Sequence, residues 1–255
     1  MPSIPSPLAR NAEALSSVLW PLFLLWSVVV AALWTSLVGT TQISESVGNP
    51  GLRSAFIFLV QIADPVWFTL AGAVLYLQLV EGEGLRTARR WALVILGTAA
   101  VIAVSSAWSA FPLGPVRYTT RLGMKLGPVP FGWPLLWFVV LVSARQLATN
   151  LAGRASPAVL ALITAAIASL TSFNLEPIAK LRAFWLWFPS ERTAAVHPPW
   201  QNHVTWFVTA ALLTWLLRPE WITPRAVAHR WRPALVLVTL NALCLATHLR
   251  LLIRG

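Results

Sequence analysis

The chain has 255 residues, of which 57% are hydrophobic and 11% are charged, and its mean hydropathy is +0.70. These values exclude an ordinary soluble domain and are typical of a polytopic membrane protein. The formal net charge is +11, but the cations lie in short segments between apolar runs, so we expect anionic lipid headgroups rather than nucleic acid as their partners. The single cysteine, Cys244, allows neither an intrachain disulfide nor a two-cysteine metal site.

Seven apolar segments are long enough to cross the hydrocarbon core of a bilayer, about 30 Å thick. They lack the alternation of polar and apolar residues found in barrel strands. The sequence therefore predicts an all-α, polytopic bundle of seven transmembrane helices, forming one domain over residues 1–255 behind an N-terminal tail of residues 1–17. The expected spans are residues 18–38, 54–80, 91–111, 131–149, 158–175, 202–217 and 233–252.

The first span follows a weakly basic N-terminus and has no convincing cleavage site, so we expect a retained helix rather than a cleaved signal peptide. The protein is accordingly expected to be integral to a membrane, which we assign to the bacterial cytoplasmic membrane. The second span carries Asp64, the only carboxylate deep within an expected helix. An unpaired ionisable group there is costly, so we expect a functional or interhelical role. Pro65 should kink this helix, which leaves an alternative in which Asp64 caps the broken half-helix.

The segment between the third and fourth spans combines cations, glycines and prolines without an acid, as RYTTRLGMKLGPVPFGWPLLWFVV at residues 117–140. Such a composition holds a loop in one shape at a membrane surface. We expect this loop to be an interfacial or re-entrant lid whose cations, Arg117, Arg121 and Lys125, reach the lipid headgroups. The residues expected to shape it are Gly114, Gly123, Gly127, Pro128 and Pro130.

Glu176 ends the fifth apolar segment and lies near the membrane boundary, where a partly desolvated carboxyl can act as a proton donor. The structural alternative is a headgroup-level Glu paired with Lys180 or Arg182. The tryptophans that follow would, on composition alone, form an aromatic belt at the bilayer interface; they are Trp185, Trp187, Trp200 and Trp206. Asn241 and His248 share a face of the last helix and predict interhelical hydrogen bonds.

The sequence lacks the patterns of several classes of enzyme. The four histidines form no metal-binding cluster, no aspartate-rich motif is present to hold Mg²⁺ and a diphosphate, and no glycine-rich nucleotide loop follows a strand. Any catalysis is therefore expected to be acid–base chemistry without a metal or another cofactor.

Three spaced blocks resemble the carotenoid biosynthesis membrane proteins, a family that includes the CruF-type carotenoid 1',2'-hydratases. The blocks are PLGPVRYTTRLGMKLGPVPFGWPLLWFVV at 112–140, LEP at 175–177 followed by WLW at 185–187, and PWQNHVTW at 199–206. The resemblance covers residues 105–210. It implies a lipophilic polyene substrate whose end-group double bond is hydrated through a tertiary carbocation.

Within this resemblance Glu176 would be the acid, and Asp64 a reserve acid. The indoles of Trp185, Trp187 and Trp206 would stabilise the cation. Tyr118 or Asn202 would position the water, and Ser172 would hydrogen-bond to Glu176.

Two acidic positions of the family pattern are replaced, one near Ala103 and one at Ser172. These replacements favour an alternative function, a non-catalytic carotenoid- or lipid-binding subunit of an assembly with other carotenoid-biosynthesis enzymes. A third interpretation is a proton-coupled transporter with Asp64 as the proton relay.

Overall fold

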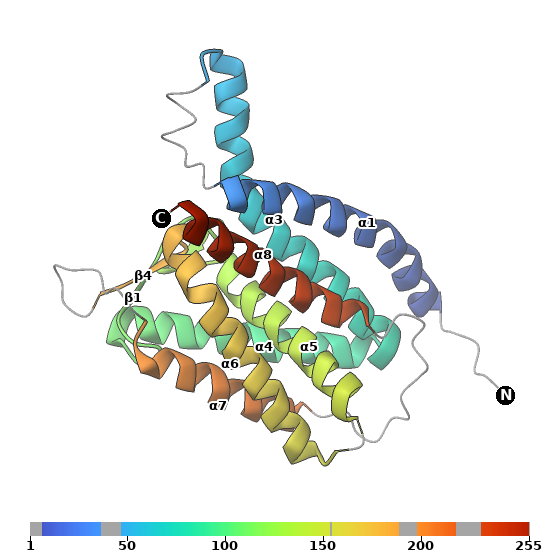
Figure 1. The fold of residues 1–255 in the computed structure, drawn as a ribbon. Coiled ribbons are helices and arrows are strands. Elements are labelled where there is room, and N and C mark those ends of the chain that lie inside the picture. Colours follow the sequence, from blue (N-terminus) through green and yellow to red (C-terminus); the bar gives the residue numbers. More distant parts are fainter. Residues whose placement is uncertain (1–6, 37–46, 154, 189–197, 218–230, 255) are drawn as a thin grey trace.

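The computed structural model describes residues 7–36, 47–153, 155–188, 198–217 and 231–254. This part of the chain contains seven helices and four short strands, which confirms the predicted all-α class (Figure 1). Six of the helices are long and apolar enough to cross a membrane, whereas α7 is shorter. The helices are α1 (Pro7–Ser36), α3 (Pro50–Glu83), α4 (Leu85–Ser109), α5 (Gly132–Ala152), α6 (Pro157–Leu181), α7 (Trp200–Leu216) and α8 (Arg232–Arg254).

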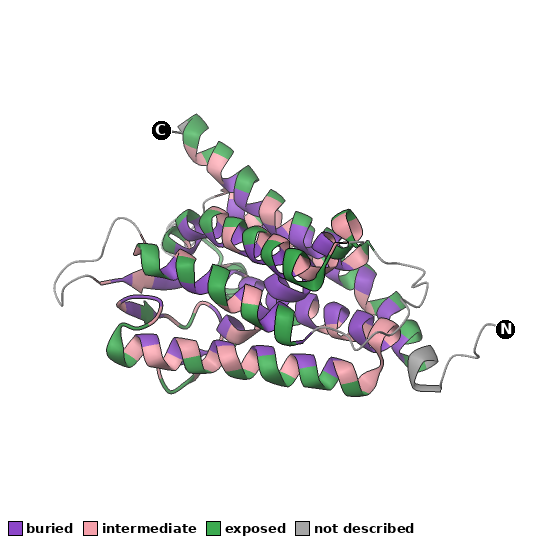
Figure 2. Cartoon of the chain, turned by 90° about the horizontal axis from the view of Figure 1, so that it is seen from below, coloured by how far each residue is buried: buried purple, intermediate pink, exposed green. Residues whose placement is uncertain are grey.

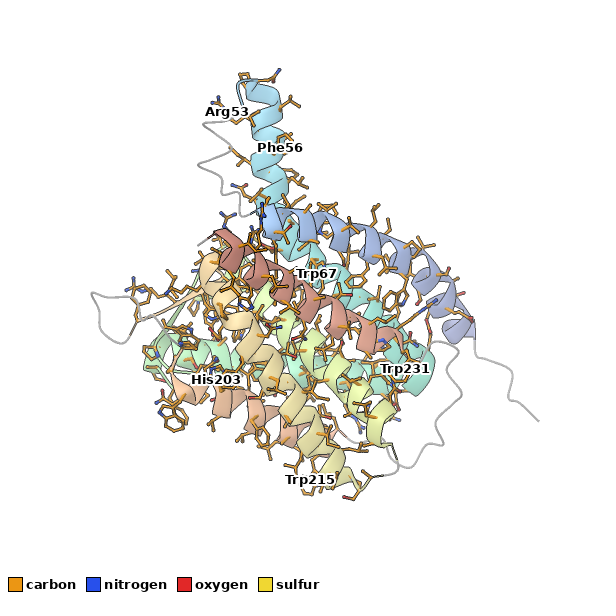
Figure 3. All side chains as sticks on the ribbon, viewed as in Figure 1. Arg53, Phe56, Trp67, His203, Trp215 and Trp231 are labelled. Atoms are coloured by element: carbon orange, nitrogen blue, oxygen red, sulfur yellow. The ribbon has the colours of Figure 1, made fainter. Side chains whose placement is uncertain are left out.

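Helices α1, α3 and α4 begin at least four residues before the spans that the apolar pattern predicts. Helix α1 starts at Pro7, within the expected N-terminal tail. Helix α3 starts at Pro50 because Asn49 caps it, with the Asn49 side chain accepting hydrogen bonds from the backbone N–H groups of Gly51 and Leu52 at 2.9 and 3.2 Å. The first part of α3 projects from the bundle, and Figure 3 shows Arg53 and Phe56 on it.

Helix α5 occupies the centre of the bundle and packs against α3, α4, α6, α7 and α8. Its residues from Leu136 to Ala144 are all buried. This burial follows from the sequence LLWFVVLVSA, which is apolar around the whole helix rather than along one stripe. The remaining helices surround α5, with α1 packed on α3 and α6 on α7.

The outward faces of the peripheral helices are exposed (Figure 2), and many of the exposed residues are large and hydrophobic. Leu93 and Val101 on α4, and Leu170 on α6, are examples. Exposed apolar surface on this scale is unusual for a soluble monomer and is expected where helices face lipid.

The loop between α4 and α5 and the segment that follows α6 are joined by backbone hydrogen bonds at one end of the bundle. Strand β1 (Val116–Tyr118) pairs antiparallel with β4 (Trp185–Trp187), so that Tyr118 lies opposite Trp185. Between β1 and α5, β2 (Lys125–Leu126) and β3 (Val129–Pro130) form a short hairpin. The predicted lid therefore folds as strand-containing loops that cover the ends of α4, α5 and α6.

Glycines permit this loop structure at two places where the backbone has positive φ. Gly127, followed by Pro128, lies in the hairpin turn with φ 62°. Gly114 has φ 108°, and a Cβ atom there would lie 2.3 Å from Cγ of Pro199, directly before α7. Only glycine meets both requirements at Gly114, since it tolerates this φ and has no Cβ.

Candidate active site

The Glu176 carboxyl group is buried near the end of α6 and is bound by side chains from β4 and α7. Trp185 Nε1 and Trp187 Nε1 donate hydrogen bonds to Oε2 at 3.2 and 2.9 Å, and Asn202 Nδ2 donates to Oε1 at 2.7 Å. Strand β4 alternates, so that Trp185 and Trp187 both face inward while Leu186 does not. In the described part of the chain no Lys or Arg forms an ion pair with Glu176.

Aromatic rings surround this carboxyl group in a connected cluster. Trp133, at the start of α5, contacts Tyr118, Trp185 and Trp206 with ring centroids 5.0, 4.8 and 6.3 Å away. Trp137 stacks on Trp206 at 3.8 Å and an interplanar angle of 10°. We call these five side chains the aromatic cluster. They come from β1, α5, β4 and α7, so the site exists only when both loops are folded against the helices.

Four buried polar atoms of this region have no hydrogen-bond partner within the described ranges. Buried polar groups are rarely left unpaired, and such groups are often ligand or water sites. Tyr118 lies in β1, outside the spanning helices, and burial raises the pKa of its phenol, an effect to which the charge of an ionised Glu176 adds. The phenol is therefore a neutral hydrogen-bonding group at ordinary pH. The four atoms are Tyr118 Oη, Trp133 Nε1, Trp137 Nε1 and Asn202 Oδ1.

Two alternatives for this region are wrong. Glu176 does not pair with Lys180 or Arg182, because indole and amide donors occupy its oxygens and Arg182 binds elsewhere. Nor do three of the tryptophans form an interfacial belt, since Trp185, Trp187 and Trp206 are only 3%, 6% and 2% exposed. The fourth, Trp200, is 71% exposed at the start of α7 and fits a belt position.

Ser172 lies one helical turn before Glu176 and is buried, but the structure shows no hydrogen bond between them. The expected contact is absent because the donors to Glu176 arrive from β4 and α7 instead. The neighbouring Thr171 joins a different network, in which Asn241 Nδ2 donates to Thr171 Oγ1 at 3.2 Å and Asn174 Nδ2 donates to Asn241 Oδ1 at 2.9 Å. This bonding between α6 and α8 confirms the interhelical role predicted for Asn241.

Asp64 lies in a second buried polar site and is not one of the side chains bound to Glu176. Its Oδ1 accepts a hydrogen bond from Trp34 Nε1, and its Oδ2 pairs with Arg182 Nη2, both at 2.8 Å. The alternative role as a helix cap is wrong, because α3 runs unbroken through Pro65 and the Asp64 oxygens bind other elements. Arg182 directly follows α6, so this ion pair connects α3 to the chain that leads into β4.

Sequence reasoning missed Trp133 and the pairing of Arg182 with Asp64. Trp133 and Trp137 are four residues apart on α5, a spacing that places both on one helical face and that could have identified the pair. No local pattern joins Arg182 to Asp64, since 118 residues separate them. Among the described residues, no three His, Cys, Asp or Glu side chains are grouped so that they could hold a metal ion.

Together, the fold and the site define a helical membrane protein with a buried carboxyl group beside stacked indoles at one end of the bundle. The family model for carotenoid biosynthesis proteins matches residues 63–254. The chain belongs to this carotenoid biosynthesis family. The match extends well beyond residues 105–210, on which the resemblance in the sequence rested.

A curated relative is the bisanhydrobacterioruberin hydratase of Haloarcula japonica, which is 33% identical over 115 residues. The aligned region covers 44% of this chain and 37% of the relative, so the chain matches well under half of the relative's length. No solved structure matches the chain.

Proposed function

We propose that the protein hydrates an end-group double bond of an acyclic carotenoid, with Glu176 as the general acid. The observation that carries this proposal is the buried Glu176 carboxyl, which accepts hydrogen bonds from two indoles and an amide and has no ion-pair partner among the described residues. Membership of the carotenoid biosynthesis family and the similarity to a hydratase support the same substrate class and reaction.

In the proposed reaction Glu176 transfers its proton to one alkene carbon, and the π electron pair forms the new C–H bond. The other carbon becomes a tertiary cation. Water adds through its oxygen to this carbon and returns one proton to the Glu176 carboxylate, so the net change is the addition of one water. The protein supplies the acid and the environment, and the step requires no redox partner.

The aromatic cluster suits the cationic intermediate because a cation over an indole face is stabilised by about 0.5–2 kcal/mol. Trp185 is placed to serve both purposes, since its N–H binds Glu176 while its ring contacts Trp133. The water would accept a hydrogen bond from the Tyr118 hydroxyl or donate one to Asn202 Oδ1, both of which lack a partner in the described residues.

Expression in cells that accumulate an acyclic carotenoid, followed by mass spectrometry of the pigments, tests the proposal. The wild type should produce a pigment heavier by one water. Glu176→Gln keeps the shape of the side chain and one acceptor oxygen but has no acidic proton, so it should lose this product. Glu13→Gln, which removes an exposed carboxyl from α1, is the matched control and should stay active. An active Glu176→Gln variant would remove Glu176 as the acid.

A second candidate is a carotenoid-binding subunit without catalysis, acting with other enzymes of the pathway. The replacement of two family acids by Ala103 and Ser172 favours it, and both residues are buried. The same experiment separates the two functions, because this candidate predicts pigment co-purification with the wild type and no hydrated product. The transporter interpretation gains less support, since Asp64 is ion-paired with Arg182.

A further inference from the structure

A cavity of about 570 Å³ opens between α3 and the loop that precedes the β2–β3 hairpin. Its volume lies within the roughly 300–1,000 Å³ typical of small-ligand sites. The two walls meet where a Cβ on Gly123 would lie 3.7 Å from Pro65 Cβ. The cavity lining includes Gln61, Ile62 and Val66 from α3, and Thr120, Arg121 and Met124 from the loop.

Three polar side chains of this cavity have no partner among the residues that the structure describes. Arg121 contributes a guanidinium group, Gln61 an amide and Thr120 a hydroxyl, and none of these groups takes part in a hydrogen bond, an ion pair or a ring contact there. No carboxylate lines the cavity. The cavity therefore carries the positive charge of Arg121, with the neutral hydrogen-bond donors of Gln61 and Thr120 beside it.

One wall of the cavity belongs to a loop between two helices, and the other belongs to residues 61–66 of α3. Helix α4 ends at Ser109 and α5 begins at Gly132, so the loop between them lies at the end of the bundle. Met124, Leu126 and Phe131 on this loop are exposed, which places apolar surface beside the cationic site. A ligand that suits both surfaces carries an anionic group and a hydrocarbon chain.

We propose that this cavity binds the phosphate group of an anionic membrane lipid, with Arg121 as the principal contact. A planar guanidinium binds phosphate oxygens through two parallel hydrogen bonds, and Gln61 and Thr120 supply further donors. The acyl chains lie against Ile62, Val66 and Met124. Of the three loop cations expected to reach headgroups, Arg121 lines the cavity, whereas the Arg117 guanidinium lies over the Phe188 ring at 4.9 Å.

The bound lipid would stabilise the loop that leads from Tyr118 to Trp133, two members of the aromatic cluster. Gly132 N–H donates to the Leu122 carbonyl at 2.9 Å, which ties the cavity wall to the start of α5. The proposal does not depend on the proposed hydration reaction, because no cavity residue forms a hydrogen bond or an ion pair with Glu176.

Native mass spectrometry of the protein in mild detergent, titrated with phosphatidylglycerol or phosphatidylcholine, tests the proposal. The wild type should retain phosphatidylglycerol in preference to phosphatidylcholine. Arg121→Gln should weaken phosphatidylglycerol binding about tenfold, since a hydrogen bond to a charged group is lost, and Arg121→Lys should weaken it less. Arg90→Gln removes an exposed cation from the other end of α4 and should leave binding unchanged.

Unchanged lipid binding by a folded Arg121→Gln variant would overturn the proposal, as would equal retention of the two lipids by the wild type. Displacement of bound phosphatidylglycerol by millimolar inorganic phosphate alone would show a small-anion site instead of a lipid site. Glu176→Gln should bind lipid as the wild type does, so a failure of the lipid proposal and a failure of the hydratase proposal are distinguishable.

Discussion

Replacing Asp64 by Asn should destabilise the protein strongly, because it breaks a buried ion pair while leaving the cation in place. The Asp64 side chain is 0% exposed and that of Arg182 is 10% exposed, and their closest atoms are 2.8 Å apart. An Asn at this position can still accept the hydrogen bond from Trp34, but the guanidinium loses its only charged partner in the described residues. Removal of one partner of a buried pair costs about 3–5 kcal/mol.

For a chain of this length, 1 kcal/mol corresponds to roughly 2–4 °C in Tm, so a loss of about 6–20 °C is expected. Glu83→Gln is the matched control, since Glu83 is 24% exposed and lies 3.6 Å from Arg145. Arg145 also keeps its position over the Trp91 ring at 4.1 Å. Because Glu83 is partly exposed and its contact with Arg145 is longer, this substitution should lower the free energy of unfolding less than Asp64→Asn does.

Thermal unfolding in detergent, followed by tryptophan fluorescence, measures both effects. The combined variant Asp64→Leu with Arg182→Met replaces the pair by apolar side chains and should recover most of the lost stability. A Tm for Asp64→Asn equal to that of Glu83→Gln would refute the reasoning. If Asp64→Asn kept the Tm of Glu83→Gln but lost the hydrated pigment, Asp64 would become a second candidate acid.

Two further predictions concern the loops. Burial raises the pKa of Tyr118, so as the pH rises the unfolded chain releases the phenol proton before the folded chain does. The free energy of unfolding should therefore fall as the pH rises above about 10. Tyr118→Phe should lose less free energy of unfolding over the same pH range in an unfolding titration. Gly114→Ala should lower the free energy of unfolding by about 1–3 kcal/mol or displace α7, because a Cβ would lie 2.3 Å from Cγ of Pro199. Gly127→Ala, which meets nothing within 4 Å, should change Tm less.

The apolar segments determined the number and approximate position of the helices, because a chain crossing lipid must satisfy its backbone hydrogen bonds within each segment. Helix ends were harder to locate. The cap at Asn49 places the start of α3 before the expected apolar span. Capping depends on a side chain that accepts backbone N–H groups and requires no apolar residue, so a helix can begin outside the membrane-spanning segment.

The motif around Glu176 and the WLW strand also predicted several side chains of the candidate site, although not Trp133 or Trp137. Their spacing nevertheless left two structures open, an acid facing cations at the surface or an acid among indoles. The burial of Trp185 and Trp187 shows that the acid lies among indoles. This burial depends on the pairing of β4 with β1, which are separated by about 70 residues of chain.

Which cation each acid meets was decided only by tertiary packing. Lys180 and Arg182 are the nearest cations to Glu176 along the chain, and a local rule joins them to it. The folded chain instead directs Arg182 to Asp64 on α3 and leaves Glu176 to neutral donors. Sequence patterns report neighbours along one element, whereas the electrostatic environment of a buried group is set by whichever elements pack around it.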